Sequence, residues 1–232
     1  MTTRWFLLFS LNILLIGATA HGQVINGSFS TGDFSGWTVL GNPTIDTSTP
    51  PPGATDGAVI STTNTDDVPD GVTPDTIQNA LGVILPSTND GTEAPVSGEA
   101  IYQTITLTAP ATLTFEYQTT AQDLRYPTTD NIGYSLTNTA SITGSDPDPG
   151  TFYILDASTL GSYGPVTSGV IAPGTYILGF IAYNTGDQHG LTSFEVSDIS
   201  VPEPATWMLM AGGFAFLLGL SRWVPLRCPA RR

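Results

Sequence analysis

The stretch "GEAIYQTITLTAPATLTFEYQ" at residues 98–118 decides the fold class. Apolar residues recur at every second position in two runs, residues 101–107 and 113–117, with Gln103 on the apolar face of the first run. A period of two is typical of a half-buried β-strand, because successive side chains point to opposite faces of a sheet. Pro110 lies between the runs and suits a tight turn. We therefore predict two successive antiparallel strands.

Further strands are expected along the chain. Residues 131–137 ("NIGYSLT") alternate in the same way, and residues 192–201 ("TSFEVSDISV") close the domain. Residues 151–157 ("TFYILDA") and 175–184 ("TYILGFIAYN") are apolar at consecutive positions, which predicts strands covered on both faces. No segment between residues 21 and 200 shows a long 3.6-residue period. This pattern predicts an all-β domain over 21–200, an antiparallel β-sandwich of the jelly-roll type.

The charge of the chain is strongly acidic and unevenly distributed. Arg125 is the only basic residue between residues 21 and 201, where it stands against nineteen of the twenty acidic residues, for a net charge of −18. Such a surface repels phosphate backbones and anionic lipid, so we expect no nucleic-acid partner. Neutral glycans and divalent cations remain compatible with it. The only cysteine, Cys228, lies near the C-terminus, so the domain has no disulfide.

The N-terminus "MTTRWFLLFSLNILLIGATAHGQ" has the three parts of a secretory signal peptide. Arg4 precedes an apolar run, and Ala18 and Ala20 form an A-x-A cleavage site. We predict that signal peptidase removes residues 1–20, so that the mature chain begins at His21.

The C-terminal stretch "ISVPEPATWMLMAGGFAFLLGLSRW" at residues 199–223 predicts a membrane helix. No charged residue occurs from Ala205 to Ser221, a length that covers about 25 Å as a helix. We predict a transmembrane helix over about 205–223, with Trp207 and Trp223 at the two interfaces. The arginines after it orient the tail to the cytoplasm and the acidic domain to the outside. These arginines are Arg222, Arg227, Arg231 and Arg232.

The order of short motif, apolar helix and basic tail over residues 201–232 resembles the PEP-CTERM sorting signal of Gram-negative bacteria. The motif itself is Val201-Pro202-Glu203-Pro204-Ala205, in which two prolines keep the backbone extended. The resemblance implies a protein held in the inner membrane and then processed by an exosortase, a membrane transpeptidase-like enzyme. It also implies a final place at the cell surface or in the extracellular matrix, in association with exopolysaccharide or biofilm.

The ectodomain itself resembles jelly-roll carbohydrate-binding modules of the galactose-binding-like type. The residues that carry this resemblance are "NGSFSTGDFSGW" at 26–37, the stretch at 98–118 and "FEVSDISV" at 194–201. The resemblance implies glycan binding and a structural calcium held by a glutamate and an aspartate. Asp198 matches the aspartate, whereas Ser30 occupies the place of the glutamate.

Asp198 also breaks the alternation of the last predicted strand. Phe194 and Val196 define one face that position 198 would continue, but Ile199 and Val201 fall on the other parity. Either a β-bulge shifts the register here, or Asp198 points inward. An inward carboxylate needs a partner, which a calcium ion or backbone amides would supply.

The ectodomain offers no catalytic motif in its sequence. Its histidines are His21 and His189, and neither a G-x-S-x-G nor an H-E-x-x-H pattern occurs. We expect a non-enzymatic protein without a cofactor other than that calcium. A glycosidase, built on a pair among Glu93, Glu99, Glu116 and Glu195, is the remote alternative.

Three aromatic residues are candidate stacking platforms for a glycan. They are Trp37, Tyr126 and Tyr163, and Trp37 fits the hydrophobic core equally well. A carbohydrate-binding, lectin-like module is therefore the second functional hypothesis beside a non-catalytic surface protein.

Overall fold

The structure is a computed structural model of the whole chain. It describes residues 24–48, 56–62, 71–87, 93–121, 130–142, 150–155, 160–161, 164–186 and 191–201. All of them belong to the compact unit Met1–Pro202. The predicted signal peptide, its cleavage site and the predicted membrane helix lie outside the described residues.

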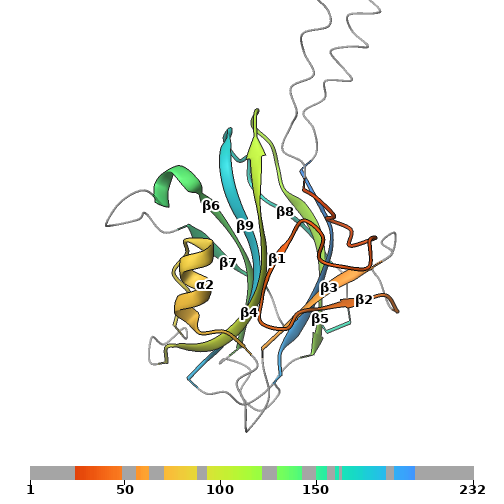
Figure 1. The fold of residues 1–232 in the computed structure, drawn as a ribbon, viewed down its shortest axis with the longest axis vertical. Coiled ribbons are helices and arrows are strands. Elements are labelled where there is room, and N and C mark those ends of the chain that lie inside the picture. Colours follow the sequence, from red (N-terminus) through yellow and green to blue (C-terminus); the bar gives the residue numbers. More distant parts are fainter. Residues whose placement is uncertain are drawn as a thin grey trace, which may run out of the picture. The chain divides into compact units, whose positions relative to one another are not determined.

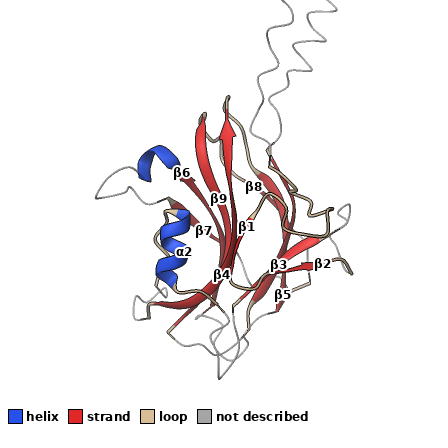
Figure 2. Cartoon of the chain, in the orientation of Figure 1, coloured by secondary structure: helices blue, strands red, loops and turns tan. Residues whose placement is uncertain are grey.

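The described part of the chain forms two five-stranded antiparallel sheets, which confirms the predicted sandwich (Figures 1 and 2). The first sheet has the strand order β1-β4-β9-β6-β7 and the second has the order β2-β3-β10-β5-β8. The first consists of β1 (Thr38–Leu40), β4 (Pro95–Leu107), β9 (Gly174–Thr185), β6 (Asp130–Asn138) and β7 (Thr151–Ile154). The second consists of β2 (Thr44–Asp46), β3 (Gly57–Ser61), β10 (Ser193–Ser200), β5 (Thr114–Ala121) and β8 (Gly164–Thr167).

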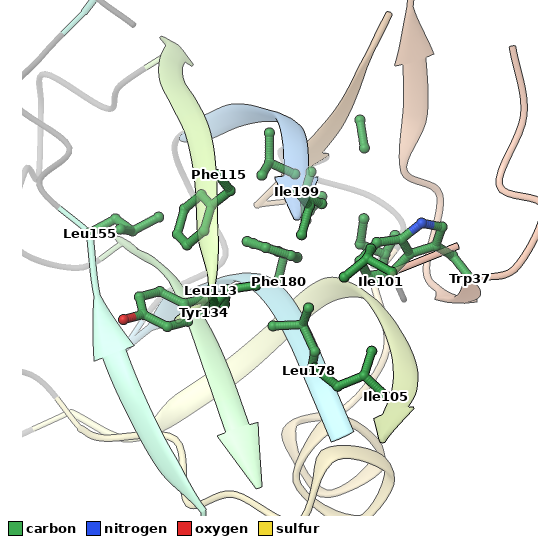
Figure 3. Packing of buried hydrophobic residues seen from close by; sticks show 14 of the residues in the cluster. Trp37, Ile101, Ile105, Leu113, Phe115, Tyr134, Leu155, Leu178, Phe180 and Ile199 are labelled. Atoms are coloured by element: carbon green, nitrogen blue, oxygen red, sulfur yellow. The ribbon is translucent and has the colours of Figure 1, made fainter. Parts of the chain in front are cut away.

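The main hydrophobic core lies between the two sheets and is centred on aromatic residues. Phe180 of β9 is fully buried and packs edge-on against Phe115 of β5, with ring centroids 5.0 Å apart (Figure 3). Phe180 also contacts Trp37, and the centroids of these two rings are 6.0 Å apart. The apolar faces predicted for residues 101–107 and 113–117 point into this core.

A short helix, α2 (Pro74–Leu81), covers the outer face of the first sheet and was not predicted. Thr73 caps its N-terminus, and Gly82 ends it in a left-handed conformation with φ 66°. Ile77 and Leu81 form a second core against β4 and β9. With only eight residues, the helix is too short for a 3.6-residue period to stand out. Its presence explains why β9 is apolar on both faces, as predicted.

The prediction that residues 151–157 are covered on both faces is wrong. β7 is the edge strand of its sheet and pairs only with β6 among the described strands. Tyr153 and Ile154 are 44% and 55% exposed. A run of apolar residues reports only composition, and it cannot distinguish a central strand from an edge strand.

The prediction about the two runs around Pro110 needs a correction. The runs do form successive strands, β4 and β5, but the two strands lie in different sheets. The chain therefore crosses from one sheet to the other at residues 108–113 instead of making a hairpin. Alternation shows which side chains face the core, and both layers of a sandwich share the same core.

We predict that Gly179 is required for α2 to lie on the first sheet. A Cβ at Gly179 would overlap the buried side chain of Leu81. Gly179→Ala should lower the free energy of unfolding by about 1–3 kcal/mol, because the packed helix has to move. Leu81→Ala should cost about 2–5 kcal/mol by leaving a cavity.

The double variant should cost less than the sum of the two single variants, because the new methyl group enters the space that Leu81 vacates. Urea unfolding of the ectodomain measures all three. Additive losses would contradict this packing.

Candidate functional site

The N-terminal segment lies across one end of the sandwich and is held there by Gln103. The Ile25 N–H donates to Gln103 Oε1 at 3.0 Å, and Gln103 Nε2 donates to the Ile25 carbonyl at 3.3 Å. This pair of hydrogen bonds explains why a polar residue occurs on the apolar face of β4. Phe29 is fully buried beside Trp37, and the Trp37 indole donates to the Asn26 carbonyl at 3.2 Å.

The last strand contains a β-bulge at Asp198. The register between β10 and β5 shifts between Ser197 and Ser200, and Asp198 has a φ of 51°. The bulge turns Ile199 into the core, where it is 4% exposed. Of the two alternatives that the sequence leaves open, the structure therefore shows the bulge, and Asp198 is partly exposed instead of pointing inward.

The end of β10 is closed by the N-terminal segment. β3 pairs with β10 only over residues 193–196, and Gly27 lies beside the strand further on. The Ile199 N–H donates to the Gly27 carbonyl at 3.0 Å. A Cβ at Gly27 would overlap the Ile199 carbonyl oxygen, so only glycine fits there. We call this Gly27–Ile199 contact the clasp.

Beyond the clasp, the chain is held by two further contacts. Ser200 Oγ and Thr114 Oγ1 share a hydrogen bond of 2.8 Å, and Val201 packs against the main core. The described structure ends at Val201. In Figure 1 the N-terminal segment, in red, runs beside the end of β10, in blue.

A cleft of about 630 Å³ lies between the N-terminal segment and the bulge. Asp198 contributes a carboxylate to it, and the side chain of Asn26 has a buried Oδ1 without a hydrogen-bond partner. The cleft is lined by Val24, Ile25, Asn26, Gly27, Ser28, Ser30, Thr31, Ser35, Asp198, Ile199 and Ser200.

The cleft resembles only half of the calcium site expected from the sequence. Calcium takes six to eight oxygen ligands and favours carboxylates. Asp198, Asn26 Oδ1 and nearby hydroxyl groups are suitable donors, but Ser30 supplies no carboxylate. No group of three or more His, Cys, Asp or Glu residues is placed to hold a metal among the described residues. The described residues therefore supply one carboxylate where the resemblance implies two.

The other predicted site residues divide between the core and the undescribed parts. Trp37 is 7% exposed and belongs to the core, so its ring offers no face to a ligand. Tyr126, Tyr163 and His189 lie outside the described residues. The same holds for Ala18, Ala20, His21, Pro202, Glu203, Pro204, Ala205, Arg222, Arg227, Arg231 and Arg232.

The structure shows an exposed tyrosine, Tyr153, that stacks on a buried one and that the sequence pattern does not single out. Tyr153 of β7 stacks on Tyr134 of β6, with ring centroids 4.7 Å apart and an angle of 13° between the rings. Burial raises the pKa of Tyr134, and the nearby Tyr153 hydroxyl raises it further. The stack supports Tyr153 on one face, while the residue remains 44% exposed. The sequence signal for it is "TFYI" at residues 151–154, an apolar run that by itself predicts a covered strand.

Comparison with known families identifies the segment that follows the clasp. Residues 200–222 match the family described as the PEP-CTERM protein-sorting motif. The chain carries a PEP-CTERM sorting motif. This motif indicates an exported protein that is anchored through a C-terminal signal before processing, and it implies an exosortase as the processing partner.

No curated protein matches the chain. Among solved structures, the chain is similar to TmCBM61 in complex with beta-1,4-galactotriose, at 10% identity and a TM-score of 0.43, covering 78% of this chain and 99% of that one. A promiscuous carbohydrate-binding module of the β-sandwich superfamily is 14% identical, with a TM-score of 0.43 and coverages of 80% and 64%. The K3 cleaved adhesin domain of Lys-gingipain from Porphyromonas gingivalis is 17% identical, with a TM-score of 0.42 and coverages of 78% and 98%.

Within the described residues, no helix has the length and apolarity needed to cross a membrane. The helix predicted at about 205–223 lies outside those residues.

We predict that the bulge depends on the conformational preference of residue 198. Asp198→Ala should lower the free energy of unfolding by about 1–2 kcal/mol, because alanine disfavours the left-handed backbone at φ 51°. Asp198→Asn should cost much less, since asparagine tolerates this conformation. Urea unfolding compares the two variants, and equal losses would show that the carboxylate, not the backbone, holds the bulge.

Proposed function

We propose that this protein is a non-catalytic surface or extracellular-matrix protein that is exported, anchored by its C-terminal helix and then processed by an exosortase. The single observation that carries the proposal is the PEP-CTERM sorting motif at residues 200–222, which starts at the last residue of the last strand. The role of the ectodomain is association with exopolysaccharide or biofilm material. Its net charge of −18 and lack of lysine suit an extracellular surface that avoids anionic polymers.

The positions of the acidic residues support a structural role for them. Glu99 is 3% exposed, and its carboxylate accepts hydrogen bonds from the backbone N–H groups of Asn42 at 3.1 Å and Ser61 at 3.2 Å. It thus ties β4 to β3 in the opposite sheet. Glu195 is also buried, whereas Asp198 is the only carboxylate lining the described cleft. A glycosidase needs two carboxylates that flank a substrate, so this arrangement favours the non-catalytic proposal.

We predict that the sorting segment determines where the protein is found. Removal of residues 202–232 should move the protein from the membrane fraction to the soluble periplasm, because the anchoring helix is lost. Replacing Pro202, Glu203 and Pro204 by alanine should leave the protein in the membrane and unprocessed, since the helix stays. Cell fractionation with immunoblotting distinguishes these outcomes. Unchanged membrane association of the truncated chain would contradict the anchoring role.

The second candidate is a carbohydrate-binding module, and the exposed Tyr153 ring favours it. A flat aromatic ring backed by a second ring offers a rigid apolar surface for the C–H face of a sugar. Because the domain is acidic, the fitting ligand class is a neutral polysaccharide. The cleft beside Asp198 would hold a calcium ion weakly, in the range of about 0.1–1 mM that is typical of extracellular modules.

We predict that Tyr153→Ala lowers binding of the ectodomain to neutral glycans by about tenfold or more, while Tyr153→Phe keeps the ring and most of the affinity. Val170→Ala, at an exposed residue of another segment, is the matched control. A glycan array followed by calorimetry, with and without calcium, measures the effect. Asp198→Asn should remove the calcium response alone. Equal binding by wild type and Tyr153→Ala would exclude this platform.

A further inference from the structure

Polar side chains replace the hydrophobic core at the end of the sandwich where β10 starts. In the first sheet, Ser97 of β4, Asn184 of β9 and Asp130 of β6 lie side by side in the register of the three strands. Each has the same parity as the residues of its own strand that face the main core. Their side chains are buried, with exposed fractions of 3%, 0% and 9%. This row of oxygen-bearing groups therefore points into the space between the two sheets.

The second sheet completes the cluster from the opposite side. Thr192, the residue before β10, donates its hydroxyl to Asp130 Oδ2 at 2.7 Å. Thr62, the residue after β3, accepts at its Oγ1 from the Thr192 N–H at 2.8 Å. Both threonines are buried. Asp130 thus lies between the two sheets and is surrounded by oxygen atoms from both.

The contact between Thr62 and Asp130 has the spacing of two metal ligands. The atoms Thr62 Oγ1 and Asp130 Oδ2 are 3.4 Å apart, whereas an O–H···O hydrogen bond measures about 2.5–3.0 Å. Calcium binds oxygen at about 2.3–2.6 Å, so two ligands at a right angle around one ion lie about 3.4 Å apart. The observed separation therefore fits two oxygen atoms that share a cation.

The hydroxyl of Ser97 is an independent indication of a ligand. Ser97 Oγ is buried and has no hydrogen-bond partner, although Ser97 lies next to Asn184 in the row. A buried hydroxyl without a partner is destabilising, and a water molecule bound to a cation would satisfy it. Because β9 separates Ser97 from Asp130, the hydroxyl is placed to hold such a water instead of binding the cation itself.

The charge of this region fits a divalent cation. Glu99 follows Ser97 on the same face of β4, so two buried carboxylates, those of Glu99 and Asp130, lie at this end. The described part of the chain contains no lysine, arginine or histidine. Carboxylate, amide and hydroxyl oxygens favour hard cations such as calcium and magnesium. Calcium accepts irregular sets of six to eight oxygens, whereas magnesium requires a nearly ideal octahedron, so this set favours calcium.

We propose that a calcium ion binds between the two sheets at this end of the sandwich. Its protein ligands are Asp130, Asn184 and Thr62, and Ser97 holds one of the waters that complete the shell. The ion joins β6 and β9 to the end of β3 in the opposite sheet. Most of its ligands are neutral, so we expect a dissociation constant of about 0.1–1 mM. The site is separate from the cleft beside Asp198 and does not depend on the proposed function.

Calorimetric titration with calcium tests the site in the full chain, purified in detergent and treated with EDTA. All chains carry Asp198→Asn, so that the cleft lacks its carboxylate. Adding Asp130→Asn keeps the size of the side chain but removes its charge, and it should weaken calcium binding at least tenfold. Asp75→Asn, at an exposed residue of α2, is the charge-matched control and should bind as its parent does. Equal affinities with and without Asp130→Asn, or a parent chain that binds no calcium at about 10 mM, would overturn the proposal.

Ser97→Ala provides a second test that does not alter the charge. Without calcium, this variant should unfold at the same or a higher temperature than its parent, because it removes a buried hydroxyl without a partner. At a hundredfold excess of calcium over the dissociation constant, the parent should gain about 5–10 °C in Tm. Ser97→Ala should gain about half as much, since loss of a group that orients a ligand weakens metal binding about tenfold. Equal gains in both chains, or an equal gain of the parent in magnesium chloride, would overturn the proposal.

Discussion

The hydrogen bond from the Ile199 N–H to the Gly27 carbonyl joins the two ends of the ectodomain. It forms because the bulge at Asp198 rotates the strand so that Ile199 enters the core, and because Gly27 has no side chain to obstruct the approach. The cleft, the buried Phe29 and the closed edge of β10 all depend on this contact. The predicted start of the mature chain and the sorting motif therefore lie within a few residues of the same point.

At the other end of β10, hydrogen bonds to buried carboxylates connect the two sheets of the sandwich. Glu99 bridges from β4 to the end of β3, and Asp130 of β6 accepts from Thr192 Oγ1 at 2.7 Å, next to the start of β10. The described domain has no cysteine and the ectodomain has a single arginine, Arg125, so cross-links and ion pairs are scarce. The buried carboxylates instead accept hydrogen bonds from backbone N–H groups and hydroxyl groups. These hydrogen bonds allow an acidic domain to bury carboxylates without basic partners.

Alternation in the sequence predicted the faces of β4, β5 and β10 correctly, because it follows from local geometry. It did not predict that β4 and β5 lie in different sheets or that β7 is an edge strand, since pairing depends on distant parts of the chain. α2 escaped prediction because eight residues carry too little periodicity. At the site, the break in parity at Asp198 pointed to the bulge, but nothing in the sequence showed that Gly27 is its partner.

The sorting motif could be recognised in the sequence because its parts follow one another along the chain. The surface that presents the motif depends instead on a contact between residues 27 and 199, which only the fold reveals. Val201, which belongs to the matched segment, is itself packed against the main core. The end of β10 thus belongs both to the fold and to the sorting motif, because Ser200 is the last residue of the strand and the first residue of the match.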